Sequence, residues 1–263
     1  MVLETLPDQA EPENHDAVIW RFLEMWKFRD LVTTGELYFQ RADLFDDESE
    51  GLPPEEYLPI LGLNPLDLRD RQELHHSIGS AAQFRESYYM SCWHLFREET
   101  CGMWKQYSED GVAICSRYEL LKCAIAVLGD RAFLGLVRYG SKHLTGWNTL
   151  RFITTKRLEF SDEQEVRALL WVEDPLAAIN RHFDAENRAH PRPLTSPPEC
   201  VPKGLRRKVD LQTLVTGVIV NPWASQETFD MASQLIRDNG CTIPVCKSEL
   251  TRYREFLPVT IPR

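Results

Sequence analysis

The chain has 263 residues, of which 43% are hydrophobic and 10% aromatic, and its 30 basic and 40 acidic side chains give a formal charge of −10. This length and apolar content suffice for a substantial core, and we expect one domain. The acidic balance argues against a nucleic-acid duplex as the main partner, because binding to the phosphate backbone draws on clustered Lys and Arg. A local basic groove stays open as an alternative.

Neither a membrane segment nor a metal site is expected. No run of eighteen apolar residues occurs, and the N-terminus lacks both the basic and the apolar segment of a secretory signal, which favours a cytoplasmic protein without a membrane partner. The seven cysteines include no Cys-x-x-Cys pair and no zinc-finger grouping, so we expect reduced thiols and no metal.

The first 45 residues predict a tail, two strands and a helix. Residues 1–16 are acidic, contain proline and are poor in large apolar side chains, so we expect a disordered tail before a domain spanning 17–263. The β-branched and aromatic run at 17–22 is typical of a strand. A short amphipathic helix is expected over 23–35, ending at Gly35, and a second strand over 36–45.

The middle of the chain predicts strands around a helical insertion. Residues 54–88 are polar and show helical periodicity, so we treat them as an α-helical insertion. Strands are expected at 87–96, 111–118 and 132–141, with a short helix or turn at 102–108. A helix or loop containing Lys156 precedes a strand at 166–172. Residues 173–208 hold six prolines and end in a basic run, which indicates an irregular excursion.

The C-terminal part predicts a strand-helix-strand unit. Residues 214–222 are a near-continuous apolar strand, and 224–240 form a helix with Ser225 as its N-cap and Gly240 as its stop. A further strand follows at 241–250. Six or seven strands among scattered helices, without regular βα alternation, indicate an α+β fold with a mixed or antiparallel central sheet.

Arg21 lies in the middle of the first expected strand. Its planar guanidinium suits a phosphate or carboxylate ligand, and the alternative is an exposed arginine or a structural ion pair.

The segment from residue 91 to 114 is unusually aromatic. Ser91, Trp93, Trp104 and Tyr107 offer hydroxyls and flat faces of the kind that hold a nicotinamide or adenine ring. The alternative is that both tryptophans belong to the core.

A pair of acids follows in SDEQEVR. Glu163 and Glu165 are two residues apart, and an extended chain would place both carboxylates on one face. Repulsion and partial burial there raise one pKa or leave one carboxylate free to stabilise a developing cation. Arg167 continues the same face and could pair with one of them. A solvated strip of charges is the alternative.

Other polar residues are weaker candidates. Tyr38 could lean over a ligand, and Lys156 could meet an anionic group. The acids between Asp46 and Glu50 lack the order of a calcium loop and are better suited to cap a helix or order a turn. The chain contains no GxGxxG, P-loop, GxSxG or HExxH motif, which argues against the common nucleotide-binding, hydrolase and metalloprotease classes.

Four motifs together resemble the uncharacterised DUF2971 family, and they span nearly the whole chain. The opening motif covers Trp20 to Gly51, although the usual Asn-Asp-Pro of its acidic turn reads Asp46-Asp47-Glu48 here and the stretch 173–208 is additional. The other three motifs fall at Ser91 to Ile114, at Lys156 with Glu163, Glu165 and Arg167, and at Val218 to Pro222 with Lys247 to Leu250.

The order of Arg21, Ser91 and the Glu-x-Glu pair is also similar to the arginine-serine-glutamate layout of ADP-ribosyltransferases. This resemblance implies an ADP-ribosyltransferase-like fold in which NAD is a consumed substrate. It implies that Arg21 holds the phosphate or ribose of NAD and that Ser91 helps to order the site. Glu165 would stabilise the oxocarbenium-like centre as nicotinamide leaves, and Glu163 would orient the acceptor.

Under the same resemblance, Trp93 or Tyr107 flanks nicotinamide. We therefore expect an NAD-consuming ADP-ribosyltransferase or glycohydrolase, serving as a toxin or phage-defence effector, with an unspecified protein or nucleic-acid acceptor. The alternative is a non-catalytic sensor of a nucleotide-like small molecule, or an interaction module. Aromatic density and the lack of an established catalytic triad favour this second reading.

Overall fold

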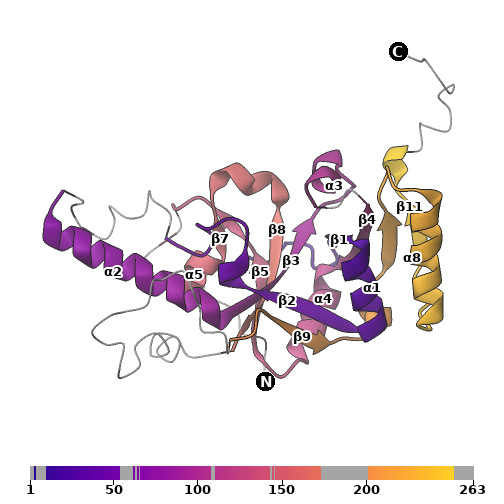
Figure 1. Ribbon diagram of the computed structural model, residues 1–263, viewed down its shortest axis with the longest axis horizontal. Coiled ribbons are helices and arrows are strands. Elements are labelled where there is room, and N and C mark those ends of the chain that lie inside the picture. Colours follow the sequence, from indigo (N-terminus) through magenta and orange to yellow (C-terminus); the bar gives the residue numbers. More distant parts are fainter. Residues whose placement is uncertain are drawn as a thin grey trace, which may run out of the picture. The chain divides into compact units, whose positions relative to one another are not determined.

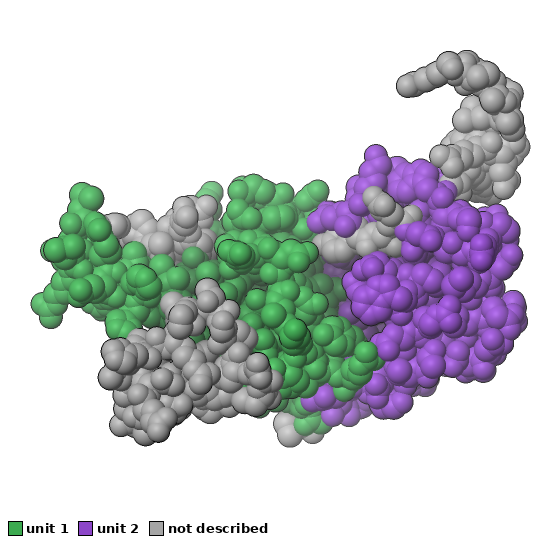
Figure 2. Space-filling model, viewed as in Figure 1, with its two compact units in different colours: residues 1–11, 38–92, 129–206 green, residues 12–37, 93–128, 207–263 purple. Residues whose placement is uncertain are grey.

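The computed structural model describes residue 3 and residues 10–53, 62, 64, 66–107, 110–142, 144, 146–172 and 201–251. The chain divides into two compact units, coloured separately in Figure 2. Unit 1 comprises residues 1–11, 38–92 and 129–206, and unit 2 comprises residues 12–37, 93–128 and 207–263. The single domain expected from the sequence remains a prediction beside this division.

Unit 2 is built on four strands in the order β11-β10-β4-β1. Strand β1 (Val18–Glu24) is antiparallel to β4 (Gly111–Arg117), β4 is antiparallel to β10 (Gly217–Val220), and β10 is parallel to β11 (Val245–Lys247). The helices of this unit are α1 (Met25–Thr34), α3 (Cys101–Tyr107), α4 (Tyr118–Ala126), α7 (Leu211–Leu214) and α8 (Gln226–Asp238), and a 3₁₀ turn η5 (Glu249–Thr251) follows β11.

Unit 1 is arranged around strand β8 (Glu165–Trp171), which pairs with β3 (Tyr88–Leu95) and, antiparallel, with β5 (Arg131–Leu136). Strand β3 pairs antiparallel with β2 (Glu36–Arg41), and β2 pairs with β9 (Gly204–Lys208). Three of the five unit boundaries fall inside strands, namely β2, β3 and β9. The remaining elements are β6 (Arg138–Tyr139), β7 (Thr155–Lys156), α2 (Leu68–Phe84), α5 (Thr149–Ile153) and the 3₁₀ turns η1 (Ala42–Leu44), η3 (Arg85–Ser87) and η4 (Leu158–Glu163).

Local sequence explains where several helices begin and end. Asp67, Asn148 and Ser225 each accept backbone N–H bonds at a helix start, which satisfies donors that the helix itself leaves unpaired. Gly35 ends α1 in the left-handed conformation, with φ 62° and its N–H bonded to Leu31. The Ser225 cap and the Gly35 stop were both expected from the sequence.

The hydrophobic core of unit 1 lies on one face of β3, β5 and β8. Side chains from these strands pack with α5 and η1. Figure 1 labels the three strands and α5. Such burial stabilises each large side chain by about 1.5–3 kcal/mol. The buried members are Ala42, Tyr88, Met90, Phe133, Leu150, Ile153 and Leu169.

The α+β class and the mixed, mostly antiparallel sheet are confirmed. The C-terminal unit β10-α8-β11 is present, and α2 lies inside the expected helical insertion, of which residues 54–61, 63 and 65 lie outside the described residues. Helix α4 and strand β9 were not expected, and residues 173–200 of the predicted excursion lie outside the described residues.

The end of the expected tail carries packing contacts. The Ala10 carbonyl accepts from the N–H of Leu136, and Pro12 is buried. His15 lies 3.3 Å from a carboxylate oxygen of Glu119. Within the described part of the chain, no helix combines the length and hydrophobicity needed to cross a bilayer.

Candidate functional site

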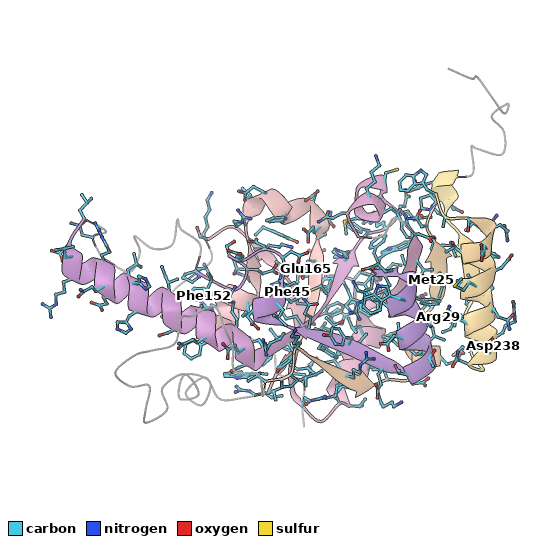
Figure 3. All side chains as sticks on the ribbon, in the orientation of Figure 1. Met25, Arg29, Phe45, Phe152, Glu165 and Asp238 are labelled. Carbon is cyan, nitrogen blue, oxygen red and sulfur yellow. The ribbon has the colours of Figure 1, made fainter. Side chains whose placement is uncertain are left out.

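Five charged side chains of unit 1 form a buried cluster, which we call the charge cluster: Glu50, Lys156, Glu163, Glu165 and Arg167. The four other than Lys156 are at most 7% exposed, and the Lys156 side chain is 10% exposed. Burying charges is costly unless they are paired, so the pairing decides what the cluster can do. Figure 3 shows Glu165 at the start of β8.

Arg167 joins two of the carboxylates. Its Nε donates to Glu165 Oε1 at 2.6 Å and its Nη2 to Glu165 Oε2 at 2.9 Å, a planar two-point contact. Nη2 also bonds Oε1 of Glu50, and Nη1 donates to the carbonyl of Ile153 at the end of α5. Arg167 therefore fixes the acidic turn to β8.

Lys156 joins the other pair. Its Nζ lies 2.8 Å from Glu163 Oε2 and 3.5 Å from Glu165 Oε2. Strand pairing sets this position, because Lys156 on β7 lies opposite Tyr139 on β6. The hydroxyl of Tyr139 accepts from the backbone N–H of Glu165 at 2.8 Å. Lys156 thus contacts both members of the Glu-x-Glu pair.

Glu163 and Glu165 both contact Lys156, but the backbone conformation that brings them there differs from the predicted one. We expected an extended chain to place Glu163 and Glu165 on one face, and this expectation is wrong. Glu163 ends the 3₁₀ turn η4, and Gln164 turns the chain with φ 41° and ψ 53°, in the left-handed region. Strand β8 begins only at Glu165, and the expectation that Arg167 continues the face of Glu165 is confirmed.

The charges of the cluster do not balance, since three carboxylates face two cations. Burial alone raises the pKa of Glu165, but the positive charges of Arg167 and Lys156 outweigh it and lower this pKa to about 2. For Glu50, burial outweighs the attraction of Arg167, so its pKa is raised. Burial lowers the pKa of Lys156, yet the neighbouring carboxylates more than offset this and raise it. Glu165 is thus held ionised.

The turn that carries Glu50 is held by Arg85 and Gly51. Arg85 Nη1 donates to the carbonyls of Glu48 at 2.8 Å and Glu50 at 3.0 Å. Gly51 has φ +77°, and a Cβ there would lie 2.5 Å from Cδ1 of Ile153. Only glycine fits this approach, which brings the turn against α5 and Glu50 beside Arg167.

We expect Gly51→Ala to lower the free energy of unfolding by about 2–4 kcal/mol, because it combines backbone strain with a steric clash. Gly129→Ala is a matched control, since Gly129 has φ +81° and no other atom lies within 4 Å of the point that its Cβ would occupy. Its cost should be about 1–2 kcal/mol, from the backbone alone. Urea unfolding of both variants measures the difference, and equal losses would show that the contact with Ile153 contributes nothing.

Cys92 on β3 reaches the same cluster. At one end of the β3–β8 pair the N–H of Val172 donates to the carbonyl of Ser87 at 3.1 Å, and at the other the Cys92 thiol is hydrogen-bonded to Glu165. The two strands therefore run in opposite directions. Burial, followed by the charge of Glu165, raises the pKa of the thiol well above its usual value, so Cys92 acts as a neutral donor.

Ser91 points away from the charge cluster. Side chains alternate along a strand, and Cys92 packs beside the core face of β3 together with Met90. Ser91, which is fully buried, therefore lies on the opposite face from Cys92 and Glu165. The structure does not bring the predicted serine to the Glu-x-Glu pair.

Arg21, Trp93 and Trp104 belong to unit 2. The Arg21 guanidinium carbon lies 5.9 Å from the centre of the Trp93 ring, a cation–π contact. Both tryptophans are 0% exposed. Trp104 packs edge-to-face on Phe22, with ring centres 4.9 Å apart, and its Nε1 donates to Glu99 at 3.0 Å. These contacts are those of core residues.

Tyr107 closes helix α3, and its side chain lies outside the described residues. Tyr38 is partly buried on β2, where its ring lies against Gly204, and the guanidinium of Arg206 is 5.7 Å from its centre. These contacts to β9 account for the position of Tyr38.

The acidic turn is ordered by protein contacts. Asp47 accepts from the backbone and hydroxyl of Ser49 and pairs with Arg157 at 3.2 Å. In the described portion of the chain, no group of three His, Cys, Asp or Glu side chains is arranged to hold a metal ion. The turn thus positions Glu50.

Sequence reasoning missed three members of this site: Glu50, Cys92 and Tyr139. A signal for Glu50 was available in the Glu-Gly pair that ends the first DUF2971-like motif, directly before Gly51. Glu50 from the acidic turn, Cys92 from β3 and four residues of the Lys156–Arg167 segment meet in or beside the charge cluster. Comparison with known proteins gave no match, since no family model, no curated protein and no solved structure matches this chain.

Proposed function

We propose that this protein is an NAD-consuming enzyme, an ADP-ribosyltransferase or NAD glycohydrolase, in which Glu165 acts at the reacting ribose. The observation that carries this proposal is the charge cluster, in which three carboxylates face two cations. A buried site with excess negative charge favours a ligand that gains positive charge as it reacts. The choice of NAD comes from the likeness of the sequence to ADP-ribosyltransferases.

Cleavage of NAD at the ribose requires a stable anion beside that ribose. The bond between the ribose C1′ and the nicotinamide nitrogen breaks, the electron pair leaves with nicotinamide, and C1′ becomes cationic. Glu165 suits this role because its lowered pKa keeps it ionised at neutral pH. Arg167 and Lys156 hold its carboxylate in one orientation, so little reorganisation is needed as charge develops.

The other residues keep narrower roles. Lys156 and Arg167 position the acid, and Glu163 is engaged with Lys156 rather than turned toward an acceptor. The phosphate contact of Arg21, the ordering role of Ser91 and the ligand contacts of Tyr38, Trp93, Trp104 and Tyr107 stay predictions from the sequence. Membership of the DUF2971 family is likewise part of the proposal.

Glu165→Gln should reduce nicotinamide release from NAD at least about 100-fold, the effect of removing one group that stabilises a charged transition state. Release is followed by chromatography with purified protein at neutral pH. Glu159→Gln is the control, since Glu159 is exposed and lies six residues earlier in η4. It should release nicotinamide like the wild type.

One further measurement keeps this test clear. Circular dichroism shows whether Glu165→Gln remains folded, because the change removes the charge that Arg167 faces. Negligible release by the wild type, or equal release by the wild type and a folded Glu165→Gln variant, would contradict the proposal.

A second candidate is a non-catalytic sensor of a nucleotide-like ligand. The observation that favours it is the closed pairing of Glu165, both of whose oxygens already accept from Arg167. A sensor would show a raised melting temperature with NAD or another nucleotide while the ligand stays intact. Turnover of NAD would exclude this reading.

A further inference from the structure

Glu50 differs from the other two carboxylates of the charge cluster in having an open oxygen. Its Oε1 accepts from Arg167, whereas its Oε2 accepts from no side chain or backbone group of the described residues. Both oxygens of Glu165 are engaged by Arg167, and Glu163 is paired with Lys156. A carboxylate oxygen without a donor among the described residues suits a donor from a bound molecule.

The side chain of Glu50 is 4% exposed, and its open oxygen is not among the fully buried atoms that lack a hydrogen-bond partner, so this oxygen keeps some exposed surface. It is also fixed in place. Arg85 holds the backbone of its turn, Gly51 lets that turn approach α5, and Arg167 holds the first oxygen. A base needs this kind of fixed position near the group whose proton it takes.

The surroundings of Glu50 make it a stronger base than an ordinary carboxylate. Burial raises its pKa above the ordinary value, and Arg167 opposes this without cancelling it. A base is most effective when its pKa lies near the working pH. The charged and titratable groups that act on Glu50 or are acted on by it are Asp47 on its own turn, Arg85 on η3, Cys92 on β3, Lys156 on β7, and Glu165 and Arg167 on β8.

We propose that Glu50 is the general base of this site: its Oε2 takes the proton of an acceptor O–H group as that oxygen bonds to the ribose C1′. The acceptor is water or a hydroxyl. Nicotinamide has left with the electron pair of the broken bond, so the acceptor oxygen supplies the new bond, and its proton passes to Glu50 and then to solvent. This inference rests on the proposed function and names its proton acceptor.

The first experiment measures nicotinamide release from NAD across pH 5 to 9. Wild-type release should rise with pH as Glu50 loses its proton. Glu50→Gln should be about 100-fold slower and should lose this rise, because an amide cannot accept the proton. Glu48→Gln is the matched control, being exposed and two residues away, and should follow the wild type. Glu50→Asp keeps a carboxylate and should retain the rise at a reduced rate.

A second experiment measures proton uptake without activity. Because the folded pKa of Glu50 is raised, its contribution to stability is fully present below its unfolded pKa and is lost as pH rises through the folded pKa. The melting temperature of the wild type should therefore fall, relative to Glu50→Gln, as pH rises above 4.5. Glu48→Gln should run parallel to the wild type.

The outcomes separate the two proposals. If the wild type releases no nicotinamide, the proposed function fails and the base role toward the ribose fails with it. If the wild type is active and Glu50→Gln keeps both the rate and the pH profile, the proposed function stands and the role of Glu50 is overturned. Parallel melting profiles for wild type and Glu50→Gln would also overturn it. Loss of the pH-dependent rise in Glu50→Gln, with a retained rise in Glu50→Asp, supports it.

Discussion

Replacing Arg167 by methionine should lower the free energy of unfolding by about 3–5 kcal/mol at neutral pH, because it leaves two buried carboxylates without their shared cation. Arg167 is 1% exposed and is the shared partner of Glu50 and Glu165. Methionine fills a similar length of the side-chain path but supplies no donor, so both acids lose their compensating charge. Urea unfolding at pH 7 measures the loss.

The same variant should show a distinctive pH dependence. The folded pKa of Glu165 is about 2, below its ordinary value of 4.5. A lowered pKa contributes stability that is fully present above the unfolded pKa and is lost as pH falls through the folded pKa. Arg167→Met removes the main source of this contribution, so its stability deficit should shrink as pH falls from 4.5 toward 2.

Arg157→Met is the control for this prediction. The Arg157 side chain is 49% exposed and pairs with Asp47 at 3.2 Å, and an exposed pair of this kind contributes about 0–1 kcal/mol. A deficit for Arg167→Met no larger than this value, or one independent of pH, would contradict the view that Arg167 compensates buried charge.

Trp104→Ala should lower the free energy of unfolding by about 3–5 kcal/mol, the usual cost of removing a fully buried aromatic side chain. Trp104 is 0% exposed, packs on Phe22 and donates to Glu99. Glu99 also accepts from the N–H of Glu249 at 2.9 Å, just after β11, so the loss should loosen that end of unit 2. Chemical denaturation monitored by circular dichroism gives the change.

Trp26→Ala is the matched control, since Trp26 is 62% exposed on α1 of the same unit, and should change stability by about 0.5 kcal/mol or less. The comparison decides between the two readings of Trp104 that the sequence left open. Replacing a residue that only lines a ligand site would weaken ligand binding with little change in stability, whereas replacing a core residue lowers stability. A small loss of stability for Trp104→Ala would instead support the interpretation of Trp104 as a ligand-lining residue.

Much of the fold could be predicted because its signals are local. Gly35 and Ser225 mark the ends of helices through their own backbone and side-chain bonding, and the apolar runs at 18–24 and 217–220 form strands. Strand β9 was missed because the basic run at 204–208 lacks the apolar alternation of a half-buried strand. Its strand conformation comes from pairing with β2, which no local pattern reveals.

The charge cluster was predicted only in part. The contact of Glu165 with Arg167 follows from strand periodicity, since residues two apart share a face. Glu50 lies 117 positions from Arg167 in sequence, and that separation carries no local signal. The turn at Gln164 was missed because a left-handed φ is unusual for a residue other than glycine, and the local sequence DEQEV contains no turn signal.

The position of Ser91 relative to Glu165 could not be predicted for a simpler reason. Choosing between Ser91 and Cys92 required knowing which face of the sheet carries Glu165, and alternation alone gives two opposite faces without identifying that one. The position of Cys92 beside Glu165 settles this choice.

Three of the five boundaries between the two units pass through strands, namely β2, β3 and β9, rather than through loops. Each unit is assembled from three stretches of polypeptide, so any contiguous fragment that contains one whole unit also contains part of the other. Trimming the gene to isolate the half that holds Glu165 would sever hydrogen-bonded ladders instead of linkers. Truncated forms should misfold or be degraded, and exchange of parts between related genes would have to replace all three stretches together.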